Sequence, residues 1–221
     1  WQRLQQHLDK GERTLLQTLA VFRSSAPRDA WGDAWADAVP QSNVGDSQHV
    51  VARRLQQLID YGLVHEDSRG GVALLPTLRE VIYTQLTVET REELHHQAAL
   101  IRAALGEYTA AAYHYQQAGQ PEAAITIWQP HVDQECRRGQ AAAALIVFQA
   151  ISAHRLPEAL ANTLHLLRSQ LYQLCGQSSQ ALEELEPLKT KTDEWVVDAA
   201  IVGGDALRTL GETDAALVRY G

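Results

Sequence analysis

The chain has 221 residues, of which 45% are apolar, and its net charge is −8. This length allows one large or two small domains with a substantial core. No apolar run is long enough to cross a bilayer, and the polar N-terminus lacks the apolar segment of a signal peptide, so we expect a cytoplasmic protein without a membrane span. The two cysteines, Cys136 and Cys175, have no ligand-like neighbours, and we expect them to be reduced and structural. The sequence contains no methionine and starts within a helical pattern, so we expect it to be a piece of a longer protein.

Residues 1–88 begin with two predicted helices. Over residues 10–22, apolar side chains recur with the period of a helix that buries one face. A second helix is expected after Pro27, where Trp31 and Trp35 stand four residues apart and therefore share a face. We expect both tryptophans to belong to the core of this first domain.

A third helix and a hairpin follow in the same domain. The helix is predicted from Ser47, a residue type preferred at N-caps, to Gly62. Two short apolar runs, residues 63–67 and 71–75, flank a turn with two glycines, which predicts an antiparallel β-hairpin. Pro76 ends the second run and is tolerated in the first turn of the next helix. Three to four helices with such a hairpin are typical of a winged-helix domain, so we predict one here, in a mostly α-helical protein.

From residue 89 to residue 221 the strand signals vanish and helical periodicity continues. Five glycines separate predicted helices, and each is followed five residues later by an alanine; the pairs are Gly106 and Ala111, Gly119 and Ala124, Gly139 and Ala144, Gly176 and Ala181, and Gly211 and Ala216. Glycine permits the positive φ that turns the chain out of one helix and into the next. Alanine one turn into the second helix allows the paired helix to approach closely.

The spacing of these glycines defines a repeat. Gly139 follows Gly106 by 33 residues, Gly176 follows after another 37, and Gly211 follows after another 35. Periods of this length belong to solenoids that are built from helix pairs. We therefore predict an α-α helical-repeat domain over residues 89–221.

Two segments of the repeat region, LCGQSSQALEELEPL and LGETDAALVRYG, resemble tetratricopeptide repeats, in which a turn glycine is followed five residues on by alanine. A wider resemblance covers nearly the whole chain. The predicted winged helix, LIDYGLVHED…GGVALLPTLREVIYTQL, followed by HHQAALIRAAL and AAYHYQQAGQPEAAITIW, is similar to the region after the nucleotide-binding domain of STAND-type (NB-ARC-like) regulatory ATPases. The resemblance implies a regulatory fragment in which the winged helix is an intramolecular joint. It also implies that the repeats bind a partner protein, a signal or the ATPase domain.

The ATPase module of that family is absent from this chain. A phosphate-binding loop needs a Gly-Lys-Ser/Thr sequence, and none of the three lysines, Lys10, Lys189 and Lys191, follows a glycine. In the family a histidine commonly touches the nucleotide phosphate; Leu75 stands at that position and cannot donate a hydrogen bond. We therefore expect no cofactor in this fragment.

A DNA-binding transcription regulator, with a winged-helix reader and a tetratricopeptide-like sensor, is the alternative. Arg53 and Arg54 lie on the third predicted helix and Arg69 lies at the tip of the hairpin, where a winged helix contacts grooves and phosphates. DNA affinity needs a cationic surface, however, and residues 1–88 carry nine Lys and Arg against ten Asp and Glu. We expect these arginines to be solvated or paired with acidic residues, and we favour the joint over the reader.

The sequence shows no cluster of residues that predicts catalysis or metal binding. His95 and His96 are adjacent and point about 100° apart on a helix, whereas zinc ligands usually share a face, so we expect no metal site. No nucleophile elbow is present, Glu183 and Glu184 are expected on a solvated helix face, and we expect no enzyme activity. Residues 89–221 carry ten Lys and Arg against seventeen Asp and Glu, so a neutral or basic protein partner suits the repeats better than nucleic acid. The sequence does not indicate an oligomeric state.

Overall fold

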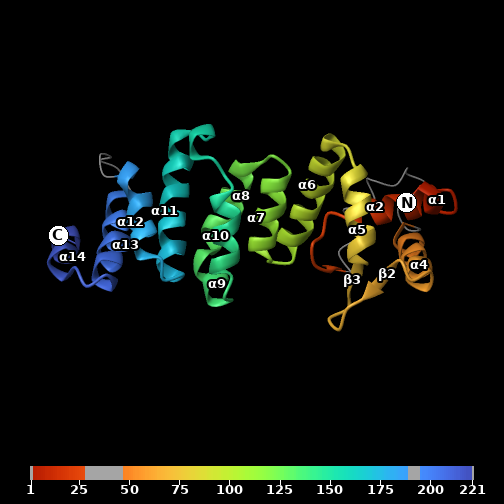
Figure 1. Cartoon of the computed structure of the whole chain (residues 1–221), viewed down its shortest axis with the longest axis horizontal. Coiled ribbons are helices and arrows are strands. Elements are labelled where there is room, and N and C mark those ends of the chain that lie inside the picture. The colour runs from red at the N-terminus through yellow and green to blue at the C-terminus, as the bar shows by residue number, and fades with distance from the viewer. Residues whose placement is uncertain (1, 28–46, 189–194, 221) are drawn as a thin grey trace. The chain divides into compact units, whose positions relative to one another are not determined.

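The computed structural model describes residues 2–27, 47–188 and 195–220. The predicted helix that contains Trp31 and Trp35 lies outside the described residues. In the part that is described, helices dominate and one small sheet is present (Figure 1). The mostly helical class predicted from the sequence is therefore confirmed. None of the described helices is long and apolar enough to cross a membrane.

The chain divides into two compact units, Trp1–Leu105 and Gly106–Gly221, which we call unit 1 and unit 2. Unit 1 contains, in chain order, α1 (Gln2–Gln5), α2 (Lys10–Leu19), β1 (Ala26–Pro27), α4 (Ser47–Asp60), β2 (Val64–Glu66), β3 (Gly71–Leu74), α5 (Pro76–Gln85) and α6 (Val88–Ala104). A capping box starts α2, in which Asp9 and Glu12 each accept the other's backbone amide, at 2.7 and 2.8 Å. Pro76 occupies the first turn of α5, as its fixed φ and missing amide allow.

The sheet of unit 1 has the strand order β1-β3-β2. β2 and β3 pair antiparallel with Val64 opposite Leu74, as the predicted hairpin requires. The sequence did not predict β1, which pairs with β3 through Ala26 opposite Val72. With two residues, β1 is too short to show the alternation by which strands are recognised. The Asp67 carboxylate stabilises the hairpin turn, where it accepts two backbone amides at 2.8 Å.

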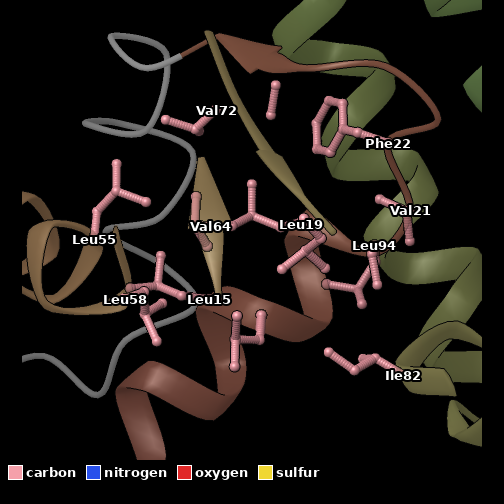
Figure 2. Packing of buried hydrophobic residues seen from close by; sticks show 14 of the residues in the cluster. Leu15, Leu19, Val21, Phe22, Leu55, Leu58, Val64, Val72, Ile82 and Leu94 are labelled. Carbon is pink, nitrogen blue, oxygen red and sulfur yellow. The ribbon is translucent and has the colours of Figure 1, made fainter. Parts of the chain in front are cut away.

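The core of unit 1 packs helices against this sheet (Figure 2). Its buried side chains come from α2, α4, α5, α6 and all three strands, and they include Leu15, Leu58, Val72, Ile82 and Leu94. Burial of an aliphatic side chain of this size contributes about 1.5–3 kcal/mol. Unit 1 therefore depends on large side chains brought together from segments that are distant in the sequence.

Unit 2 contains α7 (Tyr108–Gln117), α8 (Pro121–Trp128), α9 (Val132–Arg137), α10 (Ala141–Gln149), α11 (Glu158–Leu174), α12 (Ser178–Leu185), α13 (Trp195–Thr209) and α14 (Thr213–Tyr220), with the short 3-10 turns η1 (Gln129–His131), η2 (Ala153–Arg155) and η3 (Glu186–Leu188). Within pairs, α7 packs on α8, α11 on α12, and α13 on α14 (Figure 1). Between pairs, α13 packs on both α11 and α12. A series of packed helix pairs was expected from the glycine spacing, and the pairs named here are those that Gly119, Gly176 and Gly211 separate.

Candidate functional site

Five turns that lead into helices of unit 2 share one backbone conformation at their glycine. The five glycines of the repeat, Gly106, Gly119, Gly139, Gly176 and Gly211, have φ values between 68° and 83°. After α7, the Gly119 amide donates to the carbonyl of Gln116 at 3.2 Å, and the Gln120 amide donates to that of Tyr115 at 2.9 Å. The same two bonds recur around Gly139, Gly176 and Gly211. They satisfy the last carbonyls of the helix and reverse the chain within two residues.

The alanines of the repeat lie one turn into the second helix, where all five are buried: Ala111, Ala124, Ala144, Ala181 and Ala216. Each alanine amide donates to the carbonyl of the residue that follows the turn glycine, at 2.9 to 3.2 Å. That residue is always Glu or Gln, a regularity that the sequence analysis missed. Each alanine therefore closes the first turn of its helix and buries a single methyl group there.

Small buried residues also recur on the first helix of a pair, a regularity that was not predicted from the sequence. Seven residues before the turn glycines of α7, α11 and α13 stand Ala112, Ser169 and Gly204, all buried. In α11 the Ser169 hydroxyl donates to the carbonyl of Ala181 on α12 at 2.8 Å. Such a bond to a backbone carbonyl requires two helices in close contact. A search for small residues seven positions before each glycine would have found this signal.

A buried carboxylate joins α7, α8 and α9. Glu135 on α9 accepts the backbone amide of Thr109 at 2.9 Å and its hydroxyl at 2.7 Å, at the start of α7. Trp128 at the end of α8 donates its ring N–H to the same hydroxyl at 2.9 Å. The Arg138 guanidinium donates to the other oxygen of Glu135 at 3.1 Å. A negative charge at a helix N-terminus satisfies amides that have no partner within the helix, so this network fixes three helices at one point.

A buried arginine joins α10, α11 and α12. Arg168 on α11 donates to the carbonyls of Phe148, at 2.8 and 3.0 Å, and of Ile151, at the C-terminal end of α10. Its guanidinium also lies 3.5 Å from a carboxylate oxygen of Glu184 on α12. The other oxygen of Glu184 lies 2.7 Å from Nδ1 of His165. The Arg168 guanidinium therefore hydrogen-bonds carbonyls at the end of α10 that have no partner within that helix. It also lies close to the carboxylate of Glu184.

The expectation that Glu183 and Glu184 both lie on a solvated helix face is wrong for Glu184. Glu183 is exposed, but Glu184 is only partly exposed and makes the contacts to His165 and Arg168 described above. Adjacent residues of a helix point about 100° apart. The pair alone therefore does not reveal which carboxylate faces the neighbouring helix.

Within the described residues, no group of three or more His, Cys, Asp or Glu side chains is placed to hold a metal ion. Cys136 and Cys175 are not joined in a disulfide. Burial, with the nearby charges of Asp133 and Glu135, raises the pKa of the Cys136 thiol. A raised pKa favours the protonated thiol, which is the weaker nucleophile.

The three arginines of the DNA-reading alternative have different surroundings. Nε of Arg54 lies 3.2 Å from the Asp9 carboxylate. Its guanidinium covers Gly11, where an added Cβ would come within 2.3 Å of it. Arg53 and Arg69 are exposed. One of the three is therefore paired with an acid and two face solvent.

A further group of cationic side chains in unit 1 surrounds Tyr83, and the sequence analysis did not identify it. The guanidinium carbons of Arg79 and Arg91 lie 5.5 and 4.8 Å from the centre of the Tyr83 ring. Arg91 also donates to the carbonyl of Tyr83 at 3.0 Å, and Arg79 donates to that of Phe22 at 2.8 Å. Both cations thus contact an aromatic face and a carbonyl, which connects the end of α5 to α6 and to the segment after α2.

His95 on α6 completes this group from the buried side. Its Nε2 lies 3.1 Å from the Tyr83 hydroxyl. Burial, together with the positive charges of Arg79, Arg23 and Arg91, lowers the pKa of His95 to about 4. The ring is therefore neutral at pH 7 and acts as an uncharged hydrogen-bonding partner of Tyr83.

Comparison with known proteins shows a similarity of fold to one solved structure. No family model and no curated protein matches the chain. Among solved structures it is similar to a signal transduction ATPase with numerous domains (STAND) that has a tetratricopeptide repeat sensor, from Pyrococcus horikoshii, with a TM-score of 0.63 and 14% sequence identity. The similarity covers 99% of this chain and 33% of that protein, so the chain spans a third of its length. Helices and sheet of this chain therefore follow an architecture found in a STAND protein.

Proposed function

We propose that the chain is a non-catalytic regulatory and protein-interaction fragment of a STAND-like signalling ATPase. In this proposal unit 1 is a winged helix that serves as an intramolecular joint, and unit 2 is a tetratricopeptide-like surface for a partner or signal. The observation that carries the proposal is the structural likeness of 99% of the chain to a STAND protein with a tetratricopeptide repeat sensor. In this proposal the fragment binds no ATP itself, because its sequence has no Gly-Lys-Ser/Thr loop.

The topology of unit 1 supports the winged-helix part of the proposal. A helix (α2), a short strand (β1), a further helix (α4) and a hairpin (β2–β3) follow one another along the chain. The short strand pairs with the far strand of the hairpin, so that helices on both sides of it in the sequence are tied to one sheet. Such a compact body with a protruding hairpin suits a rigid joint.

Charge favours the joint over a DNA reader. Arg54, on the helix that would enter a groove, is engaged by Asp9. Residues 1–88 carry nine basic and ten acidic side chains, so the first unit offers no excess of positive charge for counterion release from DNA. A joint between domains needs no excess of positive charge, so the near-neutral balance of residues 1–88 is compatible with this role.

The repeats of unit 2 are suited to bind a protein. Stacked helix pairs present an extended surface on which a peptide segment or a domain can dock. Residues 89–221 carry seventeen acidic and ten basic side chains. A neutral or basic protein segment is therefore the partner that this surface would attract.

Two measurements test the proposal. ATP and magnesium titrated into the purified chain in a calorimeter should give no binding signal, and micromolar binding would contradict the non-catalytic role. The gene region upstream of Trp1 should encode a phosphate-binding loop. If it encodes none, the chain is no part of an ATPase switch.

A DNA-binding regulator is the second candidate, favoured by the exposure of Arg53 and Arg69. It predicts a gel shift with duplex DNA at physiological salt that is lost in the Arg53→Ala, Arg69→Ala double variant. The matched control is Arg54→Ala, since Arg54 is bound to Asp9 and contributes less to an outer surface. Under the proposed function no specific shift occurs with any of these proteins.

A further inference from the structure

The last helix pair of unit 2 exposes apolar side chains at positions that are buried in the earlier pairs. Positions can be counted from the turn glycine that precedes each of α7, α8, α10, α12 and α14. Nine residues after the first four glycines stands a large apolar side chain, buried in every case: Tyr115, Trp128, Phe148 and Leu185. Nine residues after Gly211 stands Tyr220, which is also large and apolar but is 44% exposed.

The position six residues after the glycine behaves in the same way. In the earlier pairs it is buried or partly buried, as seen at Ala112, Ile125, Leu145 and Leu182. After Gly211 it is Leu217, which is 65% exposed. Leu217 and Tyr220 therefore keep the residue types of an interior repeat but lack the cover that interior repeats have.

The first helix of the last pair, α13, also exposes an apolar side chain at a position that is buried in an earlier helix. Leu166, ten residues before Gly176, is only 6% exposed, whereas Ile201, ten residues before Gly211, is 49% exposed. The structure shows what covers Leu166. It packs with Leu185 and Leu188 in one apolar cluster whose other members are Ala199 and Val202, both on the next helix, α13.

One position serves as an internal control. Seven residues after the glycine, Ile146 on α10 is 70% exposed and Val218 on α14 is 83% exposed. An apolar side chain at this position faces solvent in an interior pair as well as in the last pair. The exposure of Val218 is therefore ordinary, whereas Leu217 and Tyr220 differ from their counterparts, of which Leu185 is covered by α13.

We infer that Ile201, Leu217 and Tyr220 form a docking surface for one further helix of the same polypeptide, the first helix of another helix pair after α14. This surface continues the interface that α13 makes on α11 and α12. Repeats that end an array carry a polar outer face, and α14 presents an apolar one. By analogy with Ala199 and Val202, the docking helix is amphipathic and presents small and branched apolar side chains three residues apart.

The test compares Leu217→Gln with its neighbour Val218→Gln in two proteins, the 221-residue chain and the full natural polypeptide. The readout is hydrogen exchange of the α14 amides. In the full polypeptide, Leu217→Gln should speed this exchange by at least about tenfold, because a buried leucine contact is lost. In the 221-residue chain it should leave the exchange close to that of the unsubstituted chain, since Leu217 is already mostly exposed. Val218→Gln should change the exchange in neither protein.

Four results would overturn this inference. Equal acceleration by Leu217→Gln in both proteins would show that Leu217 packs within its own helix pair. No acceleration in either protein, or a natural polypeptide that ends at Gly221, would show that no further helix covers the surface. A dimer of the 221-residue chain in sedimentation that Leu217→Gln dissociates would assign the surface to a second copy. The readout depends only on helix packing, so its outcome is independent of the proposed role in a STAND-like ATPase.

Discussion

Unit 1 and unit 2 are stabilised internally in different ways. Unit 1 gathers large side chains from distant segments, such as Leu15 on α2 and Ile82 on α5, around a sheet. Unit 2 repeats a local pattern, in which a turn glycine of positive φ is followed by an alanine that is buried in the first turns of the next helix. The two units should therefore differ in which substitutions lower their stability. Unit 1 should be damaged most by the loss of bulk, and the repeat positions of unit 2 should be damaged by the gain of bulk.

The two units also differ in the charged side chains at the centre of their polar contacts. In unit 1 the cations Arg79 and Arg91 contact a tyrosine ring and backbone carbonyls. In unit 2 the carboxylates of Glu135 and Glu184 stand at the centre of the polar networks. The histidine that lies beside the cations of unit 1, His95, has a lowered pKa, so the effect of those cations can be measured.

The largest effect is expected from Leu58→Ala in unit 1. Leu58 is fully buried in the core, and its truncation removes apolar contacts and leaves a cavity. The free energy of unfolding should fall by about 2–5 kcal/mol, measured by urea denaturation. Leu100→Ala on α6 is the control, because Leu100 is exposed and its loss should cost far less. Equal losses for the two variants would contradict the account of the core.

In unit 2 the corresponding test adds bulk. Ala144 on α10 is fully buried, and Ala144→Leu should force its helix away from the neighbouring helix, at a cost of about 1–3 kcal/mol in urea denaturation. Ala143→Leu is a matched control on the same helix, because Ala143 is exposed. If Ala144→Leu is as well tolerated as Ala143→Leu, close approach at the repeat alanines does not determine the packing of unit 2.

This contrast also explains what could be predicted from the sequence. The helix pairs of unit 2 were predictable because the rule that makes them is local: glycine, then alanine five residues on, is visible within one turn and one helix. The hairpin of unit 1 was predictable for the same reason, since two apolar runs flank adjacent glycines. These features require no knowledge of distant contacts.

The features that the sequence analysis missed depend on distant contacts. β1 has two residues and exists because Ala26 pairs with Val72, far along the chain. The Arg168–Glu184 contact joins residues on two helices, and helical periodicity does not show which carboxylate faces the partner. The cations around Tyr83 likewise come from both α5 and α6. Polar groups in such positions follow from the packing and cannot be recognised before it is known.

A smaller effect, equal in both units, is expected at the turn glycines. Gly139 has a φ of 77°, and an added Cβ would meet no atom within 4 Å, so Gly139→Ala is opposed only by its backbone conformation. The cost should be about 1–2 kcal/mol. Gly62→Ala in unit 1, with a φ of 68° and the same open surroundings, should cost the same amount. Gln140→Ala, at an ordinary φ of −86°, is the control and should be nearly neutral in urea denaturation.

The last prediction concerns the pH dependence that His95 confers on unit 1. Burial and the neighbouring arginines lower its pKa from 6.5 to about 4 in the folded protein. Between these values the unfolded chain binds a proton that the folded chain does not, so the free energy of unfolding falls as the pH falls from 6.5 towards 4. The fall is below about 1.4 kcal/mol per pH unit, which is the limit for one proton. Urea denaturation across this range, with ring NMR to follow the titration of His95, measures it.

The matched variants for this prediction are His95→Gln and His154→Gln. His154 in η2 is exposed and belongs to unit 2, so its replacement should leave the pH dependence of unit 1 unchanged. His95→Gln keeps a polar partner for the Tyr83 hydroxyl but removes the titrating ring, so stability should lose its His95-dependent fall below pH 6.5. A His95 signal that titrates near 6.5 in the folded protein would mean that the ring is not held away from water beside the arginines. The burial of His95 and the cations around Tyr83 would then have no effect on the protonation of its ring.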